Sequence, residues 1–300
     1  MTTTALAPSP LLTRPCQVQP LRHIPYVAAE DTAQIRALYA AKLPFVITGA
    51  DSNPAGVTCQ TLRERFSDLE VSCFSPDYTS ERIALGELLD RVDAGEKYRL
   101  RADIPLGRRL AKLFDVRFFE GVRSFRRSLM DLVLHTLAGK KWAVFLSSPG
   151  CKMSNHAHIN STFVIQLEGD KTWHLDFRSL GDIEHKDLYP YDFLADKRPD
   201  QELCITMRPG NILYLPAYWF HYTDTDTVSL SMHYIFAEST SYYLSRKILP
   251  LFVYELVKRP FGMLRLALAR DNEFGFGDKL KWLKSKSRKQ LAFLEQNDFS

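Results

Sequence analysis

The segment from residue 140 to residue 236 restricts the fold most, because it consists of short strand-like runs separated by turn residues. The run WAVFLSS (142–148) ends at a Pro-Gly pair, and the run VSLSMHYIF (228–236) alternates apolar residues with Ser and His. Many short strands bounded by Gly and Pro favour a β-barrel or a jelly roll. We therefore predict a mainly β core over about 140–236.

Two further runs in this segment are predicted to be β-hairpins. TFVIQLEGDKTWHLDF (162–177) has Gly169-Asp170 near its centre, and LCITMRPGNILYL (203–215) has Pro209-Gly210 at its centre. Gly and Asp favour tight reversals, and Pro followed by Gly is typical of the middle of a type II turn. Each pair of flanking strands is therefore expected to be hydrogen-bonded together.

The rest of the chain predicts helices on both sides of the β core. Residues 32–50 contain a helical repeat followed by a β-branched run, and mixed helical and extended pieces follow to residue 115. These pieces predict an α/β N-terminal layer within one domain, residues 21–239. Residues 1–20, rich in Thr, Ala and Pro, are expected to be disordered. Residues 240–300 predict a helical extension whose leucine stripe is a candidate surface for a homodimer.

Charge and cysteine usage exclude several classes of protein. The five cysteines form no Cys-x-x-Cys pair, which is typical of reduced thiols rather than a disulfide framework. A net charge of +4 is too small to indicate a nucleic-acid partner. The chain begins without a basic region followed by an apolar run, and no apolar stretch is long enough to span a bilayer. We expect a cytoplasmic protein that binds neither nucleic acid nor membrane.

Three histidines indicate a metal site. His156 and His158 lie two residues apart ahead of a strand, so in an extended chain both imidazoles point to one side. Such a pair can chelate one ion, although a lone His-x-His is more often a structural or incidental feature, such as a polar surface turn. His221 ends the run PAYWFH (216–221), where aromatic residues can limit solvent around a ligand. The third histidine favours the metal interpretation.

The ordered motifs resemble the JmjC-like, cupin-type oxygenases, which depend on Fe(II) and 2-oxoglutarate. HAH at 156–158 stands where that family has His-x-Asp, and QLEGDK at 166–171 resembles its Gln-x-x-Gly-x-Lys. PGN at 209–211 and PAYWFH at 216–221 resemble its Pro-Gly-Asp and Pro-x-x-Trp-Trp-His. The resemblance covers roughly residues 25–236. It implies a double-stranded β-helix, that is, a cupin-like jelly-roll core.

The same resemblance implies roles for individual residues. His156, His158 and His221 correspond to the catalytic iron ligands, Lys171 to the lysine that holds the distal carboxylate of 2-oxoglutarate, and Thr162 to a neighbouring cosubstrate position. A dianionic 2-oxo acid needs a metal at one end and a buried cation at the other, which agrees with these roles.

Two further positions are candidates for the cosubstrate pocket. His233 corresponds to a strand position that faces the pocket in relatives, and Arg99 to a strand position where relatives carry a pocket tyrosine. Arg101 lies on the same face of that strand as Arg99. The alternative for both arginines is an exposed strand face.

One departure from the family leaves three functions open. His158 replaces the ligand carboxylate, which leaves an Fe(II) site at +2 rather than +1. The first function is a 2-oxoglutarate-dependent oxygenase that uses O2 to hydroxylate or oxidise a peptide, an amino-acid-like molecule or a natural product. The second is a three-histidine metallo-oxygenase that does not use 2-oxoglutarate. The third is a non-catalytic metal- or peptide-binding module. The substrate and the identity of the metal are not encoded in these motifs.

Overall fold

The computed structural model describes the strand-rich part of the chain. It covers residues 23–75, 80–114, 141–151, 156–176, 188–189, 192–194, 203–246, 248–250 and 252–253. The predicted disordered segment 1–20 and the leucine stripe proposed for dimerisation lie outside the described residues.

Short helices and strands alternate before residue 115, as the sequence predicts. They are β1 (Tyr26–Ala28), α1 (Thr32–Ala41), β2 (Phe45–Thr48), α2 (Cys59–Phe66), β3 (Glu70–Phe74), β4 (Ser80–Ala84), α3 (Leu85–Asp93), β5 (Arg99–Asp103) and α4 (Ile104–Ala111). Side chains cap several of these helices at their first turn: Asp31 accepts from the Gln34 amide, and Asp103 accepts from the Leu106 amide. Such caps fix where each helix begins, because they satisfy amides that have no partner within the helix.

Strands dominate from residue 141 to residue 236. They are β6 (Lys141–Ser147), β7 (His156–His158), β8 (Ser161–Glu168), β9 (Lys171–Asp176), β10 (Leu188–Tyr189), β11 (Asp192–Leu194), β12 (Leu203–Met207), β13 (Ile212–Leu215), β14 (Phe220–Asp224) and β15 (Ser229–Phe236), followed by the helix α7 (Thr240–Tyr243).

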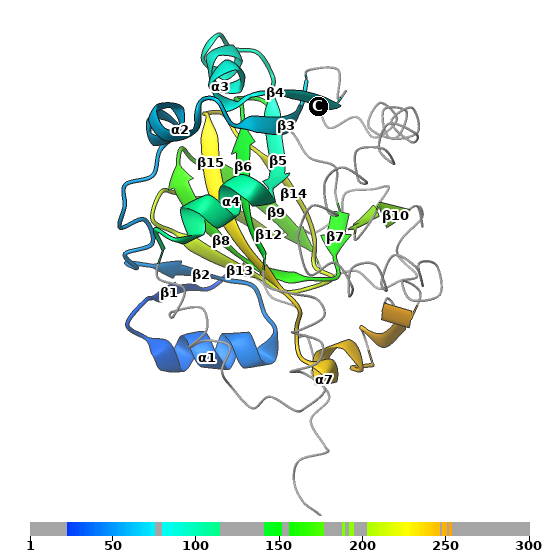
Figure 1. Cartoon of the computed structure of the whole chain (residues 1–300). Helices are drawn as coiled ribbons and strands as arrows, with labels where there is room; N and C mark the ends of the chain where they lie inside the picture. Colours follow the sequence, from blue (N-terminus) through cyan, green and yellow to red (C-terminus); the bar gives the residue numbers. More distant parts are fainter. Residues whose placement is uncertain are drawn as a thin grey trace, which may run out of the picture.

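Two sheets face each other and form the predicted jelly-roll core (Figure 1). The larger sheet has the order β1-β2-β13-β8-β15-β6-β5-β3-β4, and the smaller has the order β10-β11-β7-β14-β9-β12. The N-terminal strands extend the larger sheet at both edges, β1 and β2 on one side and β5, β3 and β4 on the other. The mainly β, cupin-like fold class is therefore confirmed, and the N-terminal layer is continuous with the core.

The two predicted hairpins are wrong. β8 pairs with β13 and β15 in the larger sheet, whereas β9 pairs with β12 and β14 in the smaller one; β12 and β13 are separated between the sheets in the same way. The turns themselves form where expected, with Gly169 and Gly210 at φ +66° and +90°. The Asn211 amide donates to the Arg208 carbonyl, which closes the second turn. Turn residues dictate where the chain reverses, but the sheet each strand joins depends on non-local packing.

Side chains that alternate in direction along the strands of the larger sheet form two apolar layers, one on each face of the sheet. The odd residues of β8, such as Phe163 and Ile165, pack with the even residues of β15 against the N-terminal helices. The even residue Val164 points the other way and packs with Trp173 and Leu213 between the two sheets. The space between the sheets is the interior of the jelly roll, and it also holds the candidate site. Within the described part of the chain, no helix has the length and apolar character needed to cross a bilayer.

Candidate metal centre

The structure brings His156, His158 and His221 together in the smaller sheet. His156 of β7 lies directly opposite His221 of β14 in the antiparallel ladder. The ring centroids of the three histidines are 4.4–5.0 Å apart, and one ring nitrogen from each residue lies within 4.8 Å of the others. His156 and His221 are buried, and His158 is half-buried. Because metal–imidazole bonds are about 2.1 Å long, small ring rotations bring all three nitrogens onto one ion.

The tautomer of His221 leaves its Nε2 available to a metal. Its Nδ1 lies 3.0 Å from the Trp219 carbonyl oxygen, which only accepts, so Nδ1 carries the proton and donates. The lone pair is then on Nε2. The indole of Trp173 stacks against the other side of the site, with its ring centroid 5.4 Å from that of His221. A backbone acceptor that holds the ring and an aromatic wall are typical of metal-binding histidines.

A strained turn positions the approach to β14. Tyr218 is fully buried and adopts φ +62°, which is uncommon for a residue with a Cβ and costs on the order of 1 kcal/mol. Its amide donates to the carbonyl of His158 at 2.7 Å. The neighbouring amide of Ala217 donates to Ser161 Oγ at 2.8 Å. These bonds join the segment before His221 to the segment that follows His158.

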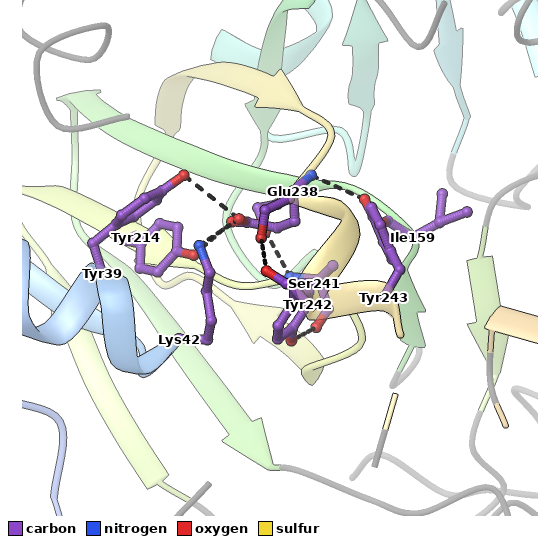
Figure 2. Close-up of polar contacts among 11 residues, drawn as sticks. Tyr39, Lys42, Ile159, Tyr214, Glu238, Ser241, Tyr242 and Tyr243 are labelled. Carbon is purple, nitrogen blue, oxygen red and sulfur yellow. Dashed lines mark hydrogen bonds and ion pairs between the residues drawn. The ribbon is translucent and has the colours of Figure 1, made fainter. Parts of the chain in front are cut away.

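Hydrogen bonds from α7 support the same two segments (Figure 2). The hydroxyl of Tyr243 donates to the Ile159 carbonyl at 2.9 Å, and that of Tyr242 donates to the Ala217 carbonyl at 2.7 Å. The Glu238 amide in turn donates to Tyr243 Oη at 3.0 Å. The residues after His158 and before His221 are therefore held from outside the barrel.

A buried ion pair anchors Glu238 itself. Lys42 Nζ lies 2.5 Å from its carboxylate, and the Tyr214 hydroxyl donates to the same group at 2.6 Å (Figure 2). Burial alone would raise the pKa of Glu238, but Lys42 and the hydrogen bonds from Tyr214 and Ser161 outweigh it, so the pKa lies below its ordinary value. The pair joins α1 to the end of β15.

Two buried cations lie near the metal-site face of the barrel. Lys171 is 3% exposed and its Nζ donates to Ser147 Oγ at 3.1 Å. Arg99 is also buried and lies opposite Ser147 in the β5–β6 ladder, on the side away from the outer core residue Leu100. Burial, and then repulsion from Arg99, lower the pKa of Lys171 to about 8. Among the described residues, no carboxylate forms an ion pair with Lys171, so this end of the interior is suited to an anion.

The burial of Arg99 excludes the exposed-face alternative for that residue. Nothing is described for the side chain of Arg101.

His233 lies in the same interior as a neutral ring. Its Nε2 is 3.1 Å from Ser231 Oγ, and it stacks on Phe145 with a centroid separation of 3.9 Å. Burial, and then the positive charge of Lys171, lower the pKa of His233 well below its ordinary value. Thr162 is buried on the interior side of β8, where its hydroxyl lies 3.4 Å from the Phe163 carbonyl. Neither residue belongs to the three-histidine group.

Several residues of the site were not found from the sequence. Trp173 lies on the same face of β9 as Lys171, and Ser147 lies opposite Arg99 on the same face of its sheet. The alternation of side chains along these strands could therefore have identified both residues. Tyr218 and Glu238 had no such signal, because their roles depend on a left-handed backbone and on a partner in α1.

The donor set fits a divalent transition metal. Three neutral imidazoles are borderline ligands that suit Fe(II), Zn(II), Ni(II), Cu(II) and Co(II), and a three-residue set leaves positions for exogenous ligands. The nearby cations Lys171 and Arg99 suit an anionic ligand at those positions.

Comparison with known proteins shows which part of the chain matches a known family. Residues 122–243 match the JmjC domain family, and this range includes the three histidines and Lys171. The resemblance to JmjC-like oxygenases predicted from the motifs is therefore confirmed for this part of the chain.

Individual relatives are more distant. The uncharacterised protein YxbC of Bacillus subtilis is 26% identical over 123 residues, which are 36% of this chain and 37% of the relative. The bifunctional lysine-specific demethylase and histidyl-hydroxylase NO66 of Drosophila persimilis is 29% identical over 136 residues, 42% of this chain and 18% of the relative. The protein of the same name from Drosophila pseudoobscura pseudoobscura matches equally well over 13% of its length. The alignments thus span well under half of each relative.

Proposed function

We propose that this chain is an Fe(II)-dependent oxygenase that uses 2-oxoglutarate and O2 to hydroxylate or otherwise oxidise an organic substrate. The observation that carries the proposal is the combination of three converging imidazoles with buried cations in the interior of one JmjC-like barrel. When bound, the iron would supply redox chemistry and a template for the cosubstrate. His156, His158 and His221 would hold it.

The other interior residues would bind and orient the cosubstrate. Lys171, with Ser147 fixing its ammonium group, would hold the distal carboxylate, and Arg99 would add positive charge to the same end. Arrival of a carboxylate favours the charged form of Lys171, which burial disfavours. Trp173, Phe145 and the neutral ring of His233 would exclude water from the space between the anion and the metal.

We propose a peptide or protein side chain as the first substrate class to test. The two fly relatives carry names that describe demethylation of lysine and hydroxylation of histidine. Amino-acid-like molecules and natural products remain the other candidates.

Anaerobic reconstitution tests the proposal before a substrate is known. The full chain is loaded with Fe(II) and titrated with 2-oxoglutarate, and the visible metal-to-ligand charge-transfer band is recorded. We expect a saturable band in the native chain and in Lys112→Met, which changes an exposed lysine of α4's C-terminal end. Lys171→Met should bind Fe(II) normally but lose the band at the same 2-oxoglutarate concentrations. No band in the iron-loaded native chain would refute cosubstrate use.

The histidine at position 158 favours a second candidate, an oxygenase that does not use 2-oxoglutarate. That function predicts iron-dependent O2 consumption that Lys171→Met leaves unchanged. A non-catalytic module predicts either no stoichiometric metal or a metal with no O2 consumption.

A further inference from the structure

A second group of reactive side chains lies on the outer face of the smaller sheet. In β9, Trp173 and Leu175 point into the barrel, so His174 between them points outward. Cys204 of β12 is directly opposite His174, and Asp224 of β14 is its diagonal neighbour. Cys204 Sγ lies 2.9 Å from His174 Nδ1, and His174 Nε2 lies 2.9 Å from Asp224 Oδ2.

The acceptor on each side of the ring determines where the protons are. A carboxylate only accepts, so His174 Nε2 carries a proton and donates it to Asp224. Nδ1 of the neutral ring therefore holds a lone pair that faces the sulfur, and the Cys204 thiol donates to it. A nucleophile, a base and a carboxylate that orients the base occur in the order found in cysteine and serine nucleophile sites.

The surroundings of the ring keep this arrangement in place. Tyr222 of β14 is paired with His174 across the edge of β9 that faces away from β12. The two rings are stacked, with 4.2 Å between their centroids and 2° between their planes. The side chain of His174 is 14% exposed, whereas Cys204 is exposed. Asp176, two residues along β9, is the other described carboxylate on this face of the three strands near the ring. A small reagent can therefore reach the sulfur while its base is held still.

The other described cysteines lack this combination. Cys59 and Cys73 are partly or fully shielded, and burial, with help from nearby carboxylates, raises the pKa of Cys59 far above its ordinary range and that of Cys73 to about 12. Cys151 donates weakly to the Tyr98 carbonyl, 3.5 Å away. No disulfide joins any of these three residues to Cys204 or to one another. They serve as internal controls for the reactivity of Cys204.

We propose that Cys204 is a site of thiol–disulfide exchange with low-molecular-weight disulfides such as glutathione disulfide. His174 accepts the thiol proton, and the thiolate attacks one sulfur of the disulfide. The Cys204–sulfur bond forms as the disulfide bond breaks, and the departing thiolate takes the proton from His174. One molecule of disulfide is thus converted into a mixed disulfide on Cys204 and one free thiol, with no other oxidant.

The pH dependence of alkylation tests the activation step. The folded full chain, in EDTA, is treated with iodoacetamide between pH 5.5 and 8.5, and modification of each cysteine is followed by peptide mass spectrometry with free glutathione as the reference thiol. An ordinary thiol is only about 1% thiolate at pH 6.5. We expect Cys204 to react at least tenfold faster than glutathione at that pH, whereas Cys59 and Cys73 stay unmodified.

Variants separate activation from mere exposure. His174→Ala should lower the rate at pH 6.5 about tenfold and give the pH profile of an ordinary thiol, and Asp224→Asn should lower it less. Protection of Cys59 and Cys73 in each variant reports that the fold is intact. Incubation with glutathione disulfide should then give a mixed disulfide on Cys204 that dithiothreitol reverses and that His174→Ala forms at least tenfold more slowly.

Either of two results would overturn the proposal, and neither depends on a variant that folds. The first is a rate for native Cys204 at pH 6.5 no greater than that of glutathione. The second is the failure of Cys204 to form the mixed disulfide faster than an unfolded peptide with the same local sequence.

Discussion

Replacing the buried lysine should make the protein more stable and weaken its binding of the proposed cosubstrate, 2-oxoglutarate. The pKa of Lys171 is lowered by burial, and then by Arg99, from the ordinary 10.5 to about 8. At about 1.36 kcal/mol per pKa unit, holding this residue charged costs the folded state about 3 kcal/mol at pH 7. Lys171→Met removes that cost and loses the hydrogen bond to Ser147, which is worth about 1 kcal/mol. We expect a net gain of about 2 kcal/mol.

The direction in which the stability difference changes with pH is the more specific test of this prediction. A lysine whose pKa is lower in the folded state penalises folding fully below about pH 8, and the penalty fades as the pH rises toward 10.5. The stability difference between Lys171→Met and the native chain should therefore shrink by about 2 kcal/mol between pH 7 and pH 9.5. Urea unfolding of the metal-free proteins at several pH values measures it, with Lys112→Met as the exposed control.

The same substitution should weaken the binding of 2-oxoglutarate, although it stabilises the fold. Truncating one partner of a buried charge pair costs about 2–5 kcal/mol, so 2-oxoglutarate should bind the iron-loaded variant at least about 30-fold more weakly. A variant destabilised by the same amount at every pH would refute the buried-cation argument. A stabilised variant with unchanged affinity would show that the cosubstrate is anchored elsewhere.

Three further substitutions test the framework and the metal centre. Glu238→Gln leaves Lys42 as a buried, unpaired charge and should cost about 3–5 kcal/mol in urea unfolding at pH 7. Because the pKa of Glu238 lies below its ordinary 4.5 despite burial, this difference should be present above pH 4.5 and be lost as the pH falls below it; a pH-independent difference would contradict the ion-pair explanation. Gly169→Ala places a Cβ 1.8 Å from the Val228 carbonyl oxygen at φ +66°, so thermal unfolding should show a loss of about 2 kcal/mol or more. His158→Asp restores a carboxylate and should tighten Fe(II) binding about tenfold in anaerobic titrations, and equal or weaker binding would count against charge as the determinant.

Local pattern was sufficient to predict most elements but not how they assemble. The helix at 32–41 and the strands around Val46 and Met232 follow from residue spacing and from β-branched composition. The turn at Gly169 was also predicted, because it needs a left-handed backbone that glycine adopts readily. The pairing of the strands on either side of this turn was mispredicted. β8 is buried on both faces, and only segments distant in the sequence can pack against both of them.

The residues of the candidate site were likewise predicted only in part from local sequence patterns. Ordered motifs predicted that His156, His158 and His221 converge, and the structure brings them together. The Cys204–His174 contact was not predicted, because it depends on the register between two strands that no turn connects directly. Registers of this kind are determined by the completed sheet.

The crossing of both tight turns from one sheet to the other has a consequence for how the protein reaches its native state. Because the strands on either side of each turn pair with distant segments, the hydrogen-bonded ladders close long loops, and His156 meets His221 only across one of them. Folding rates fall as the sequence separation of contacts grows, so this chain should fold slowly for its size. The three candidate metal ligands converge only when the smaller sheet closes, so we expect a metal to be captured late in folding rather than at its start.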